Sequence, residues 1–237
     1  NIFPWDKINL NSIGFDAGCG SGRWSYFISK YVKEIHCIEP SEAINIAKKN
    51  LSRLKNCFFY NEKISEISIK DNSMDFGFSL GVLHHTINTL ENLIICTNKL
   101  KKGSPFLIYL YYRFDNKPKI YFYVWKISNL LRLIISKLPF LYKKIITLLI
   151  ALLIYLPFAR FSKLLNIFNI KNKFIPLYYY QDKSFYVMKN DALDRFGTRL
   201  EKRYTKNEIK EMMTRANLIN IKFSDKEPFW VAVGYKK

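Results

Sequence analysis

The chain has 237 residues, of which 49% are hydrophobic, so it can bury a sizeable core and is not intrinsically disordered. Its 38 lysines and arginines outnumber 19 acidic residues, which gives a formal net charge of +19. This charge fits a nucleic-acid partner, an anionic membrane surface, or lysines dispersed over a solvated surface. The four cysteines lack the paired spacing of a zinc or disulfide framework, so we expect reduced core residues in a cytoplasmic protein.

The first informative segment in chain order is a glycine-rich turn. An apolar run over residues 12–15 leads into DAGCGSGR at residues 16–23, and a helix is expected over residues 24–31. Glycines permit a tight turn and close backbone approach to a ligand, and the helix presents free N–H groups. A Rossmann dinucleotide site would place its third glycine where Arg23 stands, and a phosphate loop would need Gly-Lys-Ser/Thr, which is absent. An S-adenosylmethionine (SAM) site and a purely structural turn are the remaining alternatives.

A second buried strand is predicted over residues 34–38, and it ends at Glu39-Pro40. An acid at the end of the second strand of an α/β unit can accept hydrogen bonds from ribose hydroxyls. Glu39 follows the glycine turn by roughly the expected ~20 residues. Its alternative role is that of a helix-entry acid, because a helix is expected over residues 41–50.

Two further strands are predicted over residues 56–60 and 75–80, and the second runs directly into GVLHH at residues 81–85. The glycine turn together with DNSMDFGFSLGVLHH at residues 71–85 closely resembles the class I SAM-dependent methyltransferases, of the methyltransferase type 11-like kind. The resemblance covers about residues 10–111 and returns in the C-terminal tail. It is specific for the cofactor fold and does not identify the substrate.

The resemblance implies a role for particular residues in binding SAM. Asp16 would orient the glycine turn and face the methionine amino group, Glu39 would bind the ribose, and the backbone at residues 63–64 would meet the adenine. The cofactor-binding residues that it implies are Asp16, Gly18, Cys19, Gly20, Gly22, Glu39, Pro40, Lys63, Ile64, Leu80 and Gly81. It implies no metal, because Gly81 and His84 stand where metal-dependent quinone O-methyltransferases carry carboxylates.

Methyl transfer from a sulfonium is an in-line substitution, so the protein mainly has to align the acceptor. Some acceptors also need a base, and histidine titrates near neutral pH. His84 and His85 follow the predicted fourth strand, where the methyl group is expected. We favour His85 as the catalytic base, because a histidine stands there in the quinone O-methyltransferases that this site resembles. A structural role for both histidines is the alternative.

After a fifth strand over residues 104–111 the methyltransferase pattern breaks off, and it resumes near residue 192. The densest apolar part of the intervening segment is residues 145–156, bracketed by Pro139 and Pro157. A spanning helix needs about 20 apolar residues. This run is shorter and is expected to stop at Pro157, so no full membrane span is predicted. An acceptor lid, an interfacial membrane contact, a buried dimer face and an ordinary helical subdomain remain as alternatives.

Towards the end of the chain, a capping box at Thr205 predicts a helix to about residue 217, and two strands are expected over residues 218–223 and 229–235. Residues outside the cofactor motifs are candidates for binding the acceptor. They are Tyr112, Arg113, Asp194 and Arg195. Asp194 has an alternative role as an ion-pair partner of Arg195 or Arg199.

The predicted fold is a Rossmann-like α/β structure: a doubly wound, seven-stranded, mostly parallel sheet with an antiparallel last strand and a helical insertion after strand five. Residues 1–111 would form the SAM-binding core, residues 112–190 the insertion, and residues 191–237 the completion of the core. Since the chain begins at Asn1, we expect an upstream segment to be missing. In related methyltransferases such a segment often folds over the cofactor.

The predicted function is SAM-dependent methyl transfer to a small or lipid-like acceptor, in the cytoplasm or peripherally on the membrane, with a homodimer as one arrangement. One alternative is a SAM-fold scaffold without turnover, attached to a membrane or a partner through the insertion. Another is an RNA methyltransferase, which would explain the charge. This chain lacks the Asn/Asp-Pro-Pro-Tyr/Phe loop of enzymes that methylate base nitrogens.

Overall fold

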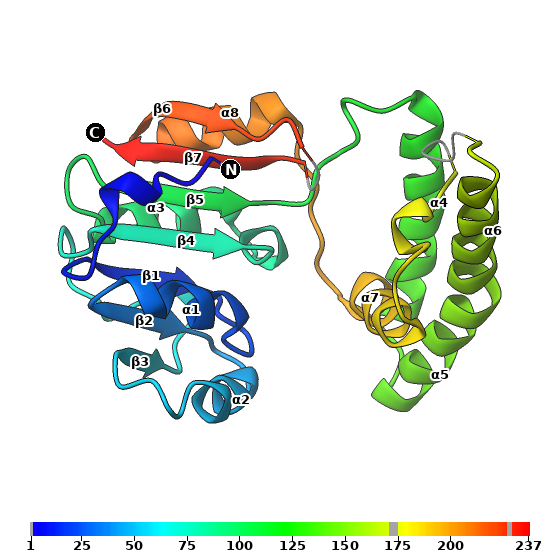
Figure 1. Ribbon diagram of the computed structural model, residues 1–237, viewed down its shortest axis with the longest axis horizontal. Coiled ribbons are helices and arrows are strands. Elements are labelled where there is room, and N and C mark those ends of the chain that lie inside the picture. The colour runs from blue at the N-terminus through cyan, green and yellow to red at the C-terminus, as the bar shows by residue number, and fades with distance from the viewer. Residues whose placement is uncertain (1, 171–174, 227–228) are drawn as a thin grey trace. The chain divides into compact units, whose positions relative to one another are not determined.

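The computed structural model describes residues 2–170, 175–226 and 229–237, and it divides into two compact units (Figure 1). Unit 1 holds the residues up to 116 together with residues 202–237, and unit 2 is residues 117–201. These boundaries differ from the predicted 111/112 and 190/191. The reason is that helix α7 (Phe185–Gly197) packs as a whole against the other helices of unit 2.

Unit 1 is built on one seven-stranded sheet with the order β3-β2-β1-β4-β5-β7-β6. The strands are β1 (Ile13–Ala17), β2 (Glu34–Ile38), β3 (Cys57–Tyr60), β4 (Phe76–Leu80), β5 (Pro105–Tyr109), β6 (Leu218–Phe223) and β7 (Val231–Lys236). The first five are parallel, whereas β7 runs antiparallel to both β5 and β6. The predicted Rossmann-like fold with an antiparallel last strand is therefore confirmed.

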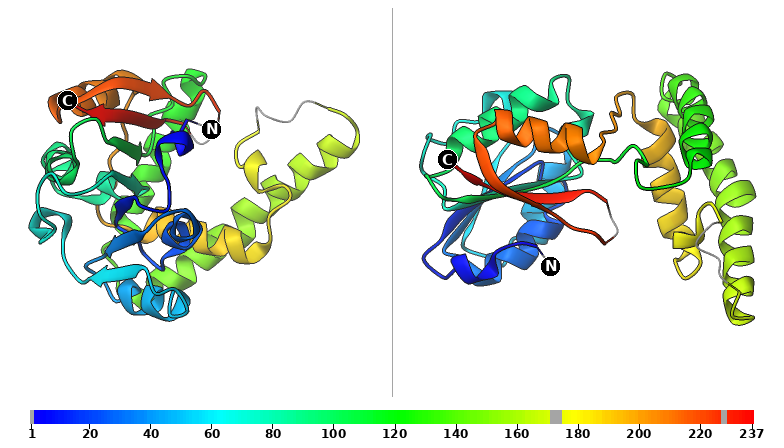
Figure 2. Two further views of the ribbon diagram at one scale, coloured as in Figure 1. Left: turned by 60° about the vertical axis from the view of Figure 1, so that its left-hand side comes forward. Right: turned by 90° about the horizontal axis from the view of Figure 1, so that it is seen from above.

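Helices cover both faces of this sheet, as Figure 2 shows. The helices of unit 1 are α1 (Arg23–Ile28), α2 (Ala43–Asn50), α3 (Thr89–Lys99) and α8 (Lys206–Arg215). On one face, α3 and α8 pack over Phe15 and Phe106, and on the other, α1 and α2 pack over Ile35 and Phe76. Central strands buried on both faces need continuous apolar runs, which explains why β1, β2 and β4 carry so few polar side chains.

Two local features of unit 1 position its functional segments. The capping box at Thr205 is confirmed, because its hydroxyl accepts from the Glu208 N–H and the Glu208 carboxylate accepts from the Thr205 N–H. Where the chain leaves unit 1 after β5 and where it returns before α8, the two segments pair through a bridge between Tyr112 and Tyr204. The Tyr204 N–H donates to the Tyr111 carbonyl at 2.9 Å, and the Arg113 N–H donates to the Tyr204 carbonyl at 2.9 Å.

Unit 2 is helical. It contains α4 (Lys119–Ile135), α5 (Phe140–Ile150), a π-helical turn (Ala151–Tyr155), α6 (Leu156–Ile167), a short 3₁₀ turn (Tyr178–Tyr180) and α7. Its core gathers on α7, where Met188, Ala192 and Phe196 pack with residues from the other helices. The segments α5, π turn and α6 form one continuous helix, which runs from green to yellow-green in Figure 2.

The expectation that this helix stops at Pro157 is wrong. The π turn ends two residues before Pro157, and its i→i+5 hydrogen bonds form a wider turn than those of an α-helix. Pro157 then occupies the first turn of α6, where a missing N–H is tolerated. The continuous helix Phe140–Ile167 has 28 residues, which by length and composition alone is enough to cross a membrane. The reason given for excluding a span therefore does not hold.

Candidate functional site

The glycine turn follows directly from β1. Gly18, Gly20 and Gly22 have φ angles of +88°, +53° and +82°, in the region that residues with a side chain rarely adopt. The N–H groups of Gly18 and Cys19 both donate to the Ile38 carbonyl, at 2.8 and 3.0 Å. The end of β2 therefore fixes the turn, which starts α1 at Arg23.

The glycines have different surroundings. A Cβ atom at Gly18 would lie 2.4 Å from Val82 Cγ1, so the fold itself requires glycine there. A Cβ atom at Gly20 would meet nothing within 4 Å. Gly20 therefore presents its backbone to open space, as a ligand that approaches the main chain would require.

Glu39 lies beside this turn, as its spacing from the glycines predicts. One carboxylate oxygen accepts from the Gly20 N–H at 3.1 Å, and the other accepts from the Ser41 N–H and hydroxyl at 3.0 and 2.5 Å. The N-cap of α2 is Glu42, so Glu39 does not cap that helix. Its position joins the end of β2 to the glycine turn, which favours ligand binding over helix entry.

Asp16 is a buried carboxylate, 1% exposed, near the carboxyl end of β1. Burial raises its pKa to about 7, the hydrogen bond from the Ser25 hydroxyl opposes this shift, and the charge of Glu39 adds to it. Ser25, on the inner side of α1, donates at 2.7 Å. Ser25 could not be predicted as a partner of Asp16, because a serine between Trp24 and Tyr26 has no pattern that indicates a role. A carboxylate in this state is suited to receive a cationic group.

The other predicted cofactor residues lie along the carboxyl edge of the parallel strands. Leu80 ends β4, and the N–H of Gly81 (φ +81°) donates to the Tyr109 carbonyl at 3.0 Å. Lys63 is exposed and begins the 3₁₀ turn Ile64–Glu66, while Ile64 is buried. Cys19 is buried and Pro40 is exposed. From β1 the chain first adds β2 and β3 on one side, and it then adds β4 and β5 on the other side of β1. The strand order therefore changes direction between β1 and β4, and such a switch point is where α/β sheets bind ligands.

The two histidines after β4 have opposite environments, which a sequence of two adjacent histidines does not reveal. His84 is fully buried, with its ring centroid 3.8 Å from that of Tyr111 and 4.0 Å from that of His85. Burial lowers the pKa of His84 to about 2, and the charges of His85 and Arg203 add to this. In the described part of the chain, neither ring nitrogen of His84 has a hydrogen-bond partner. His85 is half-buried.

Replacement of His84 by phenylalanine is expected to stabilise the protein, most of all in acid. The histidine has a pKa near 6.5 when unfolded, so below that pH the unfolded state binds the proton and wild-type stability falls. Removing two buried unpaired nitrogens should raise the free energy of unfolding by about 1 kcal/mol at pH 8. The gain should grow by about 2 kcal/mol at pH 5. Urea unfolding at both pH values measures it, and an equal gain at both would contradict a buried neutral His84.

Two predicted acceptor residues lie in unit 1. The guanidinium of Arg113 donates to the Arg203 carbonyl at 3.1 and 2.9 Å and lies 3.0 Å from the Glu208 carboxylate. Arg113 therefore holds the segment that follows β5 against the segment that leads into α8. Tyr112 is half-buried and takes part in the bridge to Tyr204. A role in acceptor binding stays a prediction for both residues.

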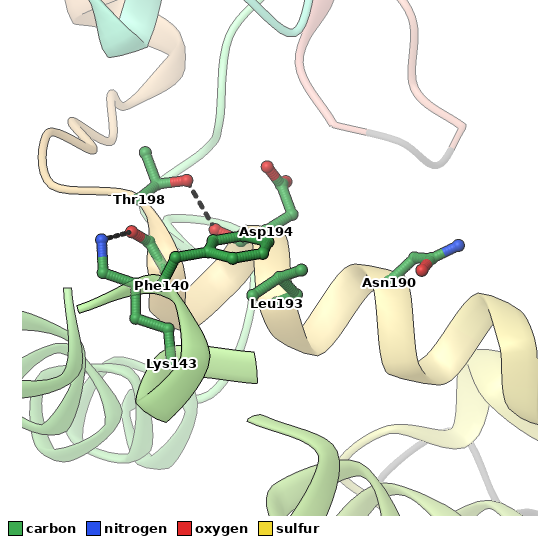
Figure 3. A pocket seen from close by; sticks show the side chains of 7 residues that line it. Phe140, Lys143, Asn190, Leu193, Asp194 and Thr198 are labelled. Carbon is green, nitrogen blue, oxygen red and sulfur yellow. Dashed lines mark hydrogen bonds between the residues drawn. The ribbon is translucent and has the colours of Figure 1, made fainter. Parts of the chain in front are cut away.

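The other two predicted acceptor residues, Asp194 and Arg195, lie in unit 2. Arg195 binds both carboxylate oxygens of Glu201 at 2.6 Å and the Ser128 hydroxyl at 3.0 Å, so its ion-pair partner is Glu201. Asp194 is exposed and borders a hollow of about 350 Å³ between α5 and α7, shown in Figure 3. The hollow is lined by Phe140, Lys143, Asn190, Leu193, Asp194, Gly197 and Thr198. An acceptor role for Asp194 and Arg195 also stays a prediction.

The side chains that could bind a metal ion lie apart from one another in the described residues. Outside residues 1, 171–174 and 227–228, no three His, Cys, Asp or Glu side chains gather closely enough to hold a metal ion. The groups that converge at the glycine turn are instead two carboxylates and backbone N–H groups. This set suits an organic ligand with hydroxyl and cationic groups.

Part of the chain matches a known domain, and its fold is found in solved structures. Residues 15–108 match the family model of a methyltransferase domain. A candidate methyltransferase from Bacillus halodurans C-125 is similar in structure, with a TM-score of 0.57 and 10% identity over 92% of this chain and 68% of that one. A SAM-dependent methyltransferase from Thermotoga maritima has a TM-score of 0.54 and 14% identity, over 98% and 86% of the two chains.

A candidate sarcosine dimethylglycine methyltransferase from Galdieria sulphuraria is 23% identical, with a TM-score of 0.41, over 44% of this chain. The match spans 40% of the length of that protein. No curated protein matches the chain.

The matched segment contains the glycine turn, Glu39 and the two histidines after β4, and it ends before the helical unit. The seven strands have the order and directions of the fold shared by the two structures that align over nearly the whole chain. Residues 15–108 thus match a methyltransferase domain, and the chain has the fold of the two methyltransferase structures to which it is similar.

Proposed function

We propose that the protein transfers a methyl group from SAM to a small or lipid-like acceptor. The observation that carries the proposal is the open backbone position at Gly20, where a Cβ atom would meet nothing within 4 Å. The Gly20 N–H donates to Glu39, and the buried Asp16 lies near the carboxyl end of the preceding strand. A purely structural turn would require neither the exposed backbone nor the two carboxylates.

The residues present fit the chemical groups of SAM. The methionine part carries an ammonium group, which would stabilise the ionised form of Asp16 in its buried position. Glu39 already accepts from the Gly20 N–H and from the Ser41 N–H and hydroxyl, and a carboxylate has about four acceptor positions, so one position remains for a ribose hydroxyl. When bound, SAM supplies a methyl group on a sulfonium whose positive charge disappears as the methyl leaves.

The protein's own contribution to the reaction is alignment of the acceptor and removal of its proton. An acceptor O–H or N–H loses one proton as the methyl group is added, and we assign that proton to a ring nitrogen of His85, which follows β4. His85 is half-buried and therefore accessible, whereas the pKa of about 2 makes His84 too weak a base at neutral pH. The two adjacent histidines thus have separate roles, His85 in proton transfer and His84 in packing.

Titration calorimetry with SAM and S-adenosylhomocysteine tests the cofactor assignment. We expect dissociation constants in the micromolar range for both. A folded protein that binds neither compound at millimolar concentration would overturn the proposal and favour the scaffold alternative. The acceptor would then be sought by S-adenosylhomocysteine release, beginning with hydrophobic alcohols, quinols and glycolipid precursors.

The substitution His85→Gln is expected to lower the rate of methyl transfer by about 10²- to 10⁴-fold for an acceptor that must lose a proton. Its affinity for SAM should not change, because His85 is assigned to the acceptor. The rate of S-adenosylhomocysteine release and the calorimetric affinity measure the two effects. Unchanged turnover over a range of pH would exclude His85 as the base, and the matched His84→Gln variant controls for disturbance of the turn.

A further inference from the structure

The helices of unit 2 leave large apolar side chains exposed to solvent. We use the name outer face for the exposed sides of α4 and of the continuous helix Phe140–Ile167. It is represented by Ile127, Leu130, Ile134, Leu141, Leu153 and Phe161, which are between 53% and 68% exposed. Water-soluble monomers rarely expose many large aliphatic side chains together on adjoining turns.

The sides of the same helices that face inward carry several small and polar residues beside the apolar core residues Ile135 and Tyr155. Ala151, Thr147 and Ser162 are buried on the long helix. Arg132 of α4 is only 3% exposed, and it donates to the Thr198 and Arg199 carbonyls at 2.8 Å each. Helices of a water-soluble domain place their large aliphatic side chains inward and their charges outward. Unit 2 differs from this pattern in its many exposed large aliphatic side chains, a distribution that is typical of helices that contact lipid.

The charge of this segment indicates what covers the outer face. Residues 117–170 contain nine lysines and arginines and no aspartate or glutamate. Lys126, Lys144 and Arg160 are exposed on these helices, and Lys137 is exposed in the turn between α4 and α5. Lys163 is exposed on α6, where it lies 3.4 Å from the Asp182 carboxylate. A surface that combines exposed aliphatic groups with an excess of positive charge complements an anionic bilayer, which offers acyl chains below a layer of negative headgroups.

The spacing of the charged residues indicates how deeply the continuous helix would enter a bilayer. Fifteen residues separate Lys144 from Arg160 on the continuous helix. At 1.5 Å per residue they cover about 22–24 Å, which is shorter than the ~30 Å hydrocarbon core. A helix that lies in the interface keeps both ends of the uncharged stretch at the headgroups, so this spacing favours an interfacial position over a span.

We propose that the outer face docks on the surface of anionic phospholipid bilayers. The basic side chains contact the headgroups, and the exposed leucine, isoleucine and phenylalanine side chains enter the acyl boundary. The docking belongs to unit 2 alone, so it stands whether or not unit 1 transfers methyl groups.

Co-sedimentation with lipid vesicles tests this docking on the full chain. We expect the protein to pellet with vesicles of phosphatidylcholine and phosphatidylglycerol, and far less with phosphatidylcholine alone. High salt should weaken the binding, since it screens the lysines. Protein that stays in the supernatant with both vesicle compositions would overturn the proposal.

Two pairs of variants separate the charge from the apolar contact. Lys137→Glu with Lys144→Glu should lower the partition into anionic vesicles at least about twentyfold, since each lost charge counts for roughly fivefold and reversal for more. Ile127→Gln with Leu153→Gln should lower it on the order of a hundredfold. The matched controls in unit 1 are Lys48→Glu with Lys49→Glu, and Leu10→Gln with Ile87→Gln, all at exposed positions. Controls that reduce binding equally would overturn the assignment to unit 2.

Other occupants of the outer face would give different results. A second copy of the chain would appear in sedimentation velocity as a concentration-dependent dimer that does not bind vesicles. A true membrane span would resist extraction with alkaline carbonate. Either result would overturn interfacial docking. Thermal unfolding of the glutamine variants should match the wild type, because the replaced side chains are more than half exposed.

Discussion

Asp16→Asn is expected to weaken SAM binding by at least about a hundredfold while it makes the unliganded protein more stable. The loss follows because a buried charge pair with the methionine ammonium would be removed. The gain follows because the pKa of Asp16 is raised from 3.8 to about 7 in the folded state. Between these values the folded state holds a proton that the unfolded state has released, so stability falls as pH rises from 4 to 7.

Above pH 7 the cost of this buried carboxylate is fully present, and asparagine removes it. We expect the free energy of unfolding to rise by about 2–4 kcal/mol at pH 8 and to change little at pH 4. Asparagine keeps an oxygen that can accept from the Ser25 hydroxyl. Denaturant unfolding without ligand at both pH values measures the gain, with the exposed Asp6→Asn as the control.

The same ionisation predicts how SAM binding depends on pH. Wild-type affinity should fall about a hundredfold between pH 8 and pH 5, because Asp16 must lose its proton before it can pair with the ammonium. The affinity of the Asp16→Asn variant should be nearly independent of pH over this range. Calorimetry at the two pH values provides the comparison. Equal pH dependence in both proteins would show that Asp16 does not face the cationic group.

The second large effect is expected from a matched pair of substitutions in the glycine turn. Gly18→Ala should destabilise the fold by about 3 kcal/mol, because its Cβ atom would lie 2.4 Å from Val82 and its φ is +88°. Gly20→Ala should cost only about 1 kcal/mol, from its φ of +53° alone.

Gly20→Ala is the milder substitution for stability, but it is the one expected to weaken SAM binding directly. Gly20→Ala should lower SAM affinity about ten- to a hundredfold although it stays folded, since the added methyl group enters the space assigned to the ligand. Denaturant unfolding and calorimetry on both variants give the two scales. If Gly20→Ala binds SAM as the wild type does, the open space beside Gly20 is not the binding site.

Much of unit 1 follows from local patterns in the sequence. The five parallel strands are short apolar runs that end at polar or glycine residues, and each was predicted near its observed bounds. The contact between Glu39 and Gly20 was predictable because the interval between strand ends in a β-α-β unit is narrowly set. Position along the chain was therefore sufficient to predict contacts between residues at the carboxyl ends of neighbouring parallel strands.

Other features depend on tertiary surroundings that the sequence does not display. The π turn before Pro157 lets the helix continue through a residue that normally ends one. His84 and His85 differ in burial, which the sequence does not show. Arg195 pairs with Glu201 because the chain after α7 brings Glu201 beside it. The apolar character of residues 145–156 is evident from the sequence. Only the packing in the structure shows which side of this helix faces α7.

The bridge between Tyr112 and Tyr204 has a consequence for how this protein can change. The chain leaves and re-enters unit 1 at two adjoining, hydrogen-bonded segments, and Asp115 also accepts from the Lys206 N–H at 2.8 Å. A short loop could therefore close the gap without breaking any strand of the sheet. Exchange of unit 2 for another segment would thus leave the seven-stranded sheet and the glycine turn intact.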